Sequence, residues 1–144
     1  LLAIEERRPR KEWQHASLFA LASIYGVELL EDNHLVAKAV LMAEFLSFHQ
    51  RHHMPCGPQT DLHHAAAFLI ESNVVAGNAL TAQTTRGRDI QFSWWSRVAD
   101  APGMVQREPF TLASLRGGAF DFTVYKTYEA CLIDRVHEES TANV

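Results

Sequence analysis

Histidine is the residue type with the most chemical potential in this chain, because five of its eight histidines fall within residues 49–64. His49 and His53 are four residues apart, which on a helix places both rings on one face, the spacing used to grip a metal from one side. Cys56 follows in the loop after this helix, and His63 lies near the start of the next helical segment. Imidazole and thiolate are both zinc ligands. One hypothesis is therefore a zinc site formed by His49, His53, Cys56 and His63.

The same cluster argues against a zinc peptidase. Residues 49–53 read HQRHH, so Gln50 stands where an HExxH motif has the glutamate that takes a proton from metal-bound water. Motifs of the types GxSxG, GxGxxG and GxxxxGK[ST] are absent from the sequence. Cys131 and His137 would lie about 240° apart around a helix and out of contact. We therefore favour a non-enzymatic role and expect no cofactor other than zinc.

A second group of residues combines arginines with aromatic side chains. Residues 82–118 hold five arginines against three acidic residues, whereas residues 12–81 hold two basic and seven acidic residues. Guanidinium groups and aromatic rings together suit single-stranded nucleic acid, and the same residue types anchor protein interfaces. The predicted binding surface consists of Arg86, Arg88, Trp95, Arg97 and Arg107.

Strand alternation predicts which of two adjacent tryptophans is available to a partner. Ile90, Phe92 and Trp94 recur at every second residue, so they share one side of a strand. We expect that side to face the core. Trp94 is then buried and Trp95 is exposed, because neighbours on a strand point to opposite faces.

The elements that must position these groups have mostly helical patterns. Apolar residues recur at helical spacing from about Lys11 to Tyr25, and a second helix is predicted at about 33–53, capped by Asp32 or Asn33. Its stretch Leu35–Phe48 is apolar on nearly every face, so this helix is expected at the centre of the core. The stretch has 14 residues and two charges, which is too short for a bilayer span. We expect no membrane partner.

Thr60 or Asp61 is expected to cap a third helix that begins after the Pro- and Gly-containing loop at 54–60. Alternating residues at about 89–94 and 119–125 predict a small two-stranded β element, while the absence of a helix breaker after residue 119 favours helix later in that segment. The predicted fold is mainly α, a single compact domain of five or six helices over residues 12–139. Residues 1–11 are expected to form a basic arm or linker and residues 140–144 a frayed tail.

Composition bounds the function further. The 144 residues carry a net charge of −4, so the chain has no general attraction to nucleic acid or anionic lipid. Two cysteines without a CxxC pair favour a reduced, intracellular setting. Because the chain starts at Leu1, we expect a piece of a longer protein.

Three functional hypotheses follow from these patterns. The leading one is a non-enzymatic helical interaction or assembly domain that binds a protein partner or a second copy of itself. An alternative is a nucleic-acid-binding accessory domain that uses the Arg/Trp segment 86–116. A second alternative is a metal-dependent enzyme or zinc-stabilised domain built on the cluster at 49–64.

Overall fold

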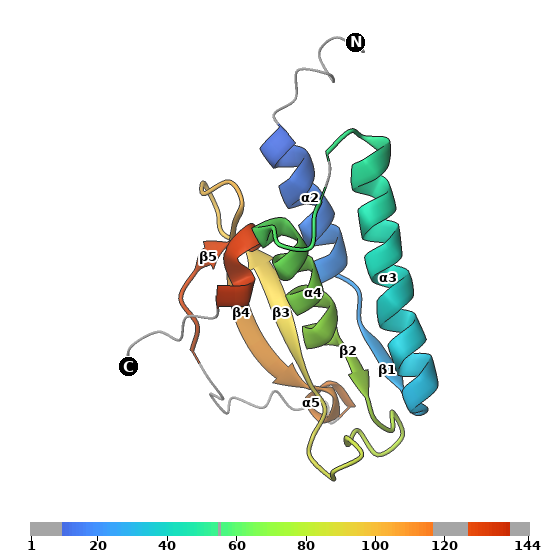
Figure 1. Ribbon diagram of the computed structural model, residues 1–144. Coiled ribbons are helices and arrows are strands. Elements are labelled where there is room, and N and C mark those ends of the chain that lie inside the picture. Colours follow the sequence, from blue (N-terminus) through green and yellow to red (C-terminus); the bar gives the residue numbers. More distant parts are fainter. Residues whose placement is uncertain (1–9, 55, 117–126, 139–144) are drawn as a thin grey trace.

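The computed structural model describes residues 10–54, 56–116 and 127–138, in which three long helices pack beside two small sheets (Figure 1). The elements in chain order are α2 (Arg10–Ala22), β1 (Gly26–Glu28), α3 (Glu31–Arg51), α4 (Asp61–Asn73), β2 (Val74–Ala76), β3 (Gln91–Arg97), β4 (Met104–Thr111), α5 (Leu112–Arg116), β5 (Cys131–Leu132) and the 3-10 helix η1 (Ile133–Glu138).

The fold mixes helices and sheets, so the prediction of a mainly α domain with five or six helices is wrong. Within the described residues, β3 and β4 form an antiparallel pair along the whole of β3, and β5 joins the other edge of β4. The two short strands β1 and β2 form a separate parallel pair. The strand expected at 89–94 is present as β3, but it pairs with β4. The segment 119–125, which we expected as its partner, lies outside the described residues.

The central helix is α4. Its side chains at Leu62, Ala65, Ala66, Leu69 and Ile70 are all buried. The helix contacts α2, α3, β3 and η1, and in Figure 1 it lies between the three-stranded sheet and α3. Helix α4 begins after Thr60, whose Oγ1 accepts a hydrogen bond of 3.2 Å from the backbone N–H of His63. The predicted cap at this position is therefore confirmed.

The prediction that the helix at 33–53 forms the structural centre is wrong. Helix α3 lies at the edge of the molecule in Figure 1, and its buried residues are Phe45 and His49. It begins at Glu31 after Leu30, which makes no side-chain cap, so the expected cap by Asp32 or Asn33 is also wrong. The apolar pattern of α3 predicts burial on nearly every side. The domain covers only one side of the helix, and the other side is exposed.

Candidate functional site

The four residues of the hypothetical zinc site are not gathered around one point. The ring of His49 is buried, with Nδ1 donating to the Phe45 carbonyl oxygen at 2.8 Å and Nε2 lying 3.4 Å from Ser17 Oγ. His53 is exposed, Cys56 Sγ lies 3.8 Å from Thr60 Oγ1, and His63 is half-buried beside His64. None of the four belongs to a group of three metal-ligating side chains that closes to within 4.8 Å in the described part of the chain.

One such group does form in the described residues, from Asp61, His137 and Glu138. His137 Nε2 lies 3.1 Å from Asp61 Oδ1. The guanidinium of Arg135 lies 2.9 Å from Glu138 Oε1 and 3.3 Å from Asp61 Oδ2, so a cation already pairs with both carboxylates. The contacts therefore form an ion-pair network that joins the start of α4 to η1.

The predicted Arg/Trp surface is divided among three places. Arg86 and Arg88 are exposed in the loop that precedes β3. Arg97 lies at the other end of β3, with its guanidinium carbon 3.8 Å from the centroid of the Phe19 ring. Trp95 and Arg107 are half-buried and contact the residues around α4. The structure thus brings together only the pair Trp95 and Arg107 among these five described residues.

Trp95 and Arg107 form part of the core wall. The Trp95 ring lies 6.2 Å from the Phe68 ring of α4, and the Arg107 guanidinium carbon lies 5.2 Å from the Trp95 ring and 4.3 Å from the Tyr128 ring. Arg107 Nε also donates to Ser93 Oγ at 2.7 Å. A guanidinium stacked on aromatic faces and hydrogen-bonded in this way is held as a structural group.

The orientation predicted for the two tryptophans is reversed. Trp94 is 55% exposed, while Trp95 packs against the core cluster. Phe92 shares the side of Trp94 and is buried, because Tyr25 and Phe110 pack around it at ring distances of 5.4 and 5.7 Å. Both faces of β3 are therefore partly covered, and alternation alone could not identify the exposed tryptophan.

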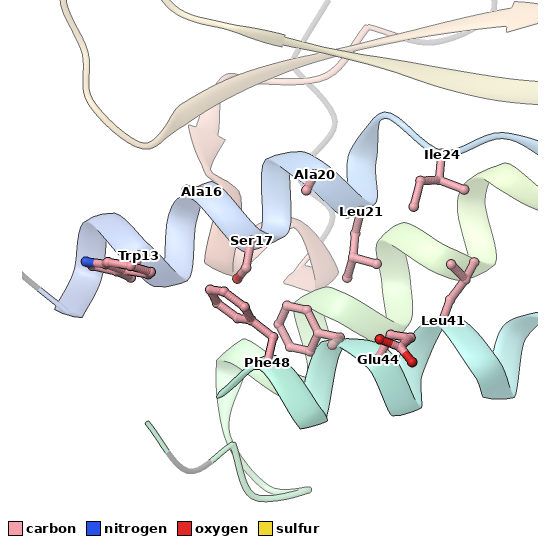
Figure 2. A pocket seen from close by; sticks show the side chains of 10 residues that line it. Trp13, Ala16, Ser17, Ala20, Leu21, Ile24, Leu41, Glu44 and Phe48 are labelled. Carbon is pink, nitrogen blue, oxygen red and sulfur yellow. The ribbon is translucent and has the colours of Figure 1, made fainter. Parts of the chain in front are cut away.

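An apolar groove of about 440 Å³ runs between α2 and α3 (Figure 2). Small side chains at Ala16, Ser17 and Ala20 of α2 line it opposite Leu41 and Phe48 of α3. Their size leaves the space between the two helices unfilled. The groove could therefore accept side chains from another molecule.

Aromatic rings close one end of this groove. The Trp13 ring lies 6.1 Å from the Phe48 ring and 4.8 Å from the His52 ring. Burial lowers the pKa of His49, which lies between α2 and α3, although the hydrogen bond to the Phe45 carbonyl acts in the opposite direction. The lowered pKa favours the uncharged form of the His49 ring at neutral pH.

A second apolar surface lies next to the groove on α3. Leu35, Val36 and Val40 are 56%, 59% and 54% exposed, and Ala39 and Ala43 are exposed among them. Positions three and four residues apart on a helix share a face. We define the α3 outer face as Val36, Ala39, Val40 and Ala43. This face and the α2–α3 groove are the candidate functional site.

The charged residues in the middle of α3 lie off this outer face. Lys38 Nζ pairs with Glu71 Oε2 of α4 at 2.9 Å, so it points toward the rest of the domain. Glu44 lines the α2–α3 groove (Figure 2). The outer face of α3 is therefore an uninterrupted apolar strip.

A separate apolar hollow of about 570 Å³ lies beside β3 and β4, where Tyr25, Phe92, Trp94 and Phe110 contribute to its lining. Its lining comes from strands, connecting segments and the five-residue helix α5, and it lacks the long continuous helical face found on α3. For this reason we place the candidate site on α2 and α3.

No protein-family model matches this chain, and no curated protein or solved structure is significantly similar to it. In the part of the chain that the structure describes, no helix is both long and apolar enough to cross a membrane. The function must therefore be argued from the surface itself.

The sequence analysis missed the candidate site although it had identified both helices. Trp13, Ala16 and Ala20 lie within the helical pattern predicted at about 11–25, and Val36 and Val40 lie within the stretch expected at the centre of the core. The signal that could have revealed the site is the apolar character of Leu35–Phe48 on nearly every side, in a chain with another helix better suited to the core.

Proposed function

We propose that this domain is a non-enzymatic assembly module that binds a protein through the α3 outer face and the adjoining α2–α3 groove. The observation that carries the proposal is the exposure of Val36 and Val40, one turn apart in the stretch Leu35–Phe48 of α3, which is apolar except for Lys38, Glu44 and Ser47. A helix with this pattern belongs in an interior. The domain itself covers one side of α3, and a partner would cover the other.

The free energy of association favours a partner that buries several exposed side chains of α3 at once. Full burial of a valine or leucine side chain contributes about 1.5 to 3 kcal/mol, and roughly half of that remains for side chains that are already half-buried. The exposed residues of α3 therefore offer a few kcal/mol, most of which offsets the entropy lost on association. A helix laid along the strip would cover these residues together.

Neither alternative function gains support from the described residues. The nucleic-acid hypothesis used Trp95 as a stacking residue, but Trp95 packs against Phe68 of α4. Arg86 and Arg88 are exposed, but they lack the Trp95 ring as a stacking group beside them. The zinc hypothesis used His49, His53, Cys56 and His63, and in the described part of the chain none of these belongs to a group of three ligand side chains within 4.8 Å.

Site-specific photo-crosslinking tests this proposal. A benzophenone amino acid is introduced at position 36 or 40 of the intact chain, and at position 80 as a matched control. Leu80 is an apolar loop residue that is 89% exposed. On irradiation in the cells that produce the protein, we expect protein adducts from positions 36 and 40 and few from position 80. Equal adduct yields at all three positions, or none at positions 36 and 40, would contradict the proposal.

A further inference from the structure

We infer that the partner on the α3 outer face is a second copy of this chain, paired with the first through antiparallel α3 helices. This inference rests on the proposed function, because it names the occupant of the same surface. It is carried by the distribution of charge and side-chain size along α3.

The charges near the outer face at the two ends of α3 have opposite signs, and Glu44, which is exposed in the middle of the helix, lies about 20° from Arg51 around it. Asp32 lies in the first turn and Arg51 is the last helical residue, and both are exposed. At about 100° per residue, Asp32 falls on the same side of the helix as Val36 and Ala43, and Arg51 flanks that side. The strip is therefore acidic at its start and basic at its end, its middle is apolar, and Glu44 lies at its edge on the same flank as Arg51.

Only an antiparallel arrangement of two such strips joins unlike charges. A two-fold axis that passes between positions 41 and 42 places Asp32 of each copy beside Arg51 of the other. Parallel pairing would bring Asp32 against Asp32 and Arg51 against Arg51. Antiparallel pairing also places the N-terminus of one helix beside the C-terminus of the other, which the helix dipoles favour.

Side-chain size is complementary in the same register. Position 40 lies opposite position 43, so each Val40 meets Ala43 of the second copy, and the two-fold axis repeats this contact. Position 36 lies opposite Ser47, which is a small residue. A two-fold interface requires one patch to be complementary to itself. The α3 outer face meets this requirement in shape, with Ala39 of each copy opposite Glu44 of the other, and the two ends of α3 meet it in charge.

The expected dimer is weak. Helix α3 has 21 residues, and a helix of that length is about 30 Å long. A contact along one such strip is at the small end of specific interfaces, which bury roughly 800 Å² per partner. We therefore expect dissociation in the micromolar range, where sedimentation velocity can follow it.

Charge reversal tests the antiparallel pairing. Asp32→Arg or Arg51→Asp alone should weaken the dimer about tenfold at low salt, because each change places like charges together at both ends of the strip. An equimolar mixture of the two variants should associate as tightly as the wild type, since the unlike charges then meet again. Arg86→Asp, a reversal in the loop before β3, is the matched control and should leave association unchanged. Recovery in the mixture cannot come from a change in folding of either variant.

The outcomes separate this inference from the proposed function. Loss of association in a Val36→Ser/Val40→Ser variant without recovery in the charge-reversed mixture would overturn the antiparallel pairing and leave the surface as a contact site. A wild-type chain that stays monomeric would also overturn the inference, while crosslinks from positions 36 and 40 to another protein would preserve the proposed function. Association that survives Val36→Ser/Val40→Ser would contradict both.

Discussion

Asn73 and Ser93 join the end of α4 to β3 through two reciprocal hydrogen bonds. Asn73 Nδ2 donates to the Ser93 carbonyl oxygen at 3.0 Å, and the Ser93 backbone N–H donates to Asn73 Oδ1 at 2.8 Å. Both residues are buried, and the hydroxyl of Tyr25 donates to the same Ser93 carbonyl at 3.1 Å. This pair anchors the free edge of β3 to the end of α4.

Asn73→Ala should therefore destabilise the domain strongly. The substitution leaves the N–H and the carbonyl of Ser93 without their amide partners in a buried place, which costs about 2 to 4 kcal/mol. Urea unfolding measures the change in the free energy of unfolding. Gln59→Ala, in the exposed loop before α4, is the control and should change it by less than about 0.5 kcal/mol. A loss below about 1 kcal/mol for Asn73→Ala would show that the amide does not fix the strand.

Substitution of Trp95 should destabilise the domain more than substitution of Trp94, which is the reverse of the sequence-based prediction. Trp95→Ala removes a ring that packs against Phe68 and Arg107, and should lower the free energy of unfolding by about 3 kcal/mol. Trp94→Ala removes a ring that is 55% exposed and should cost less than half as much. Chemical denaturation of both variants makes the comparison. Equal losses would mean that the two rings are buried to the same extent in solution.

Substitutions in α3 and α4 test where the core lies. Leu69 of α4 is fully buried, so Leu69→Ala should cost about 2 to 5 kcal/mol through lost contacts and an unfilled cavity. Leu46 of α3 is only half-buried beside the core, so Leu46→Ala should cost clearly less. Thermal and urea unfolding of the two variants, measured side by side, give the order. A larger loss for Leu46→Ala than for Leu69→Ala would show that α3, and not α4, is the central helix.

His49 should make stability depend on pH. Burial lowers the pKa of His49 in the folded state, so the unfolded chain takes up this proton at a higher pH than the folded chain does. Below the unfolded value of about 6.5, protonation then favours unfolding, and the free energy of unfolding falls from pH 7 to pH 5. His49→Gln should reduce this slope. An unchanged slope in the variant would assign the effect to other groups.

Asp134 acts in a different pH range and cannot produce that slope. Burial alone would raise the pKa of Asp134, but the ion pair with Lys11 at 2.7 Å and the neighbouring His15 hold the pKa below its usual value. Its contribution is present above the unfolded value and is lost only as the pH falls below about 4. The pH dependence measured by urea unfolding between pH 7 and pH 5 therefore contains no contribution from the titration of Asp134.

The sequence predicted the elements whose patterns are local. The cap at Thr60, the helix that follows it and the strand around Phe92 all depend on neighbouring residues, and all are present. Strand β4 was missed because Arg107, Glu108 and Pro109 interrupt its apolar alternation, and proline cannot donate to a sheet ladder. Strands β1 and β2 have three residues each, too few for a periodic signal.

The candidate site could not be derived from local pattern, because it depends on what covers each face. Val36 and Val40 belong to a stretch that is apolar on nearly every side, and such a stretch indicates burial without showing whether the same chain or another supplies it. The small residues Ala16 and Ala20 fit an internal helix contact equally well. Only the packing of α4 in the centre leaves α3 at the edge and opens the groove.

Sedimentation velocity of wild-type protein and of a Val36→Ser/Val40→Ser variant, across the micromolar range, tests the central claim most directly. Serine and valine have similar helix propensities, so the variant should keep the stability of the wild type to within about 1 kcal/mol. Leu80→Ser, at the exposed loop position, is the control. We expect the wild type and Leu80→Ser to associate as their concentration rises, and Val36→Ser/Val40→Ser to remain a single chain. Undiminished association of Val36→Ser/Val40→Ser would show that the α3 outer face is not the contact surface.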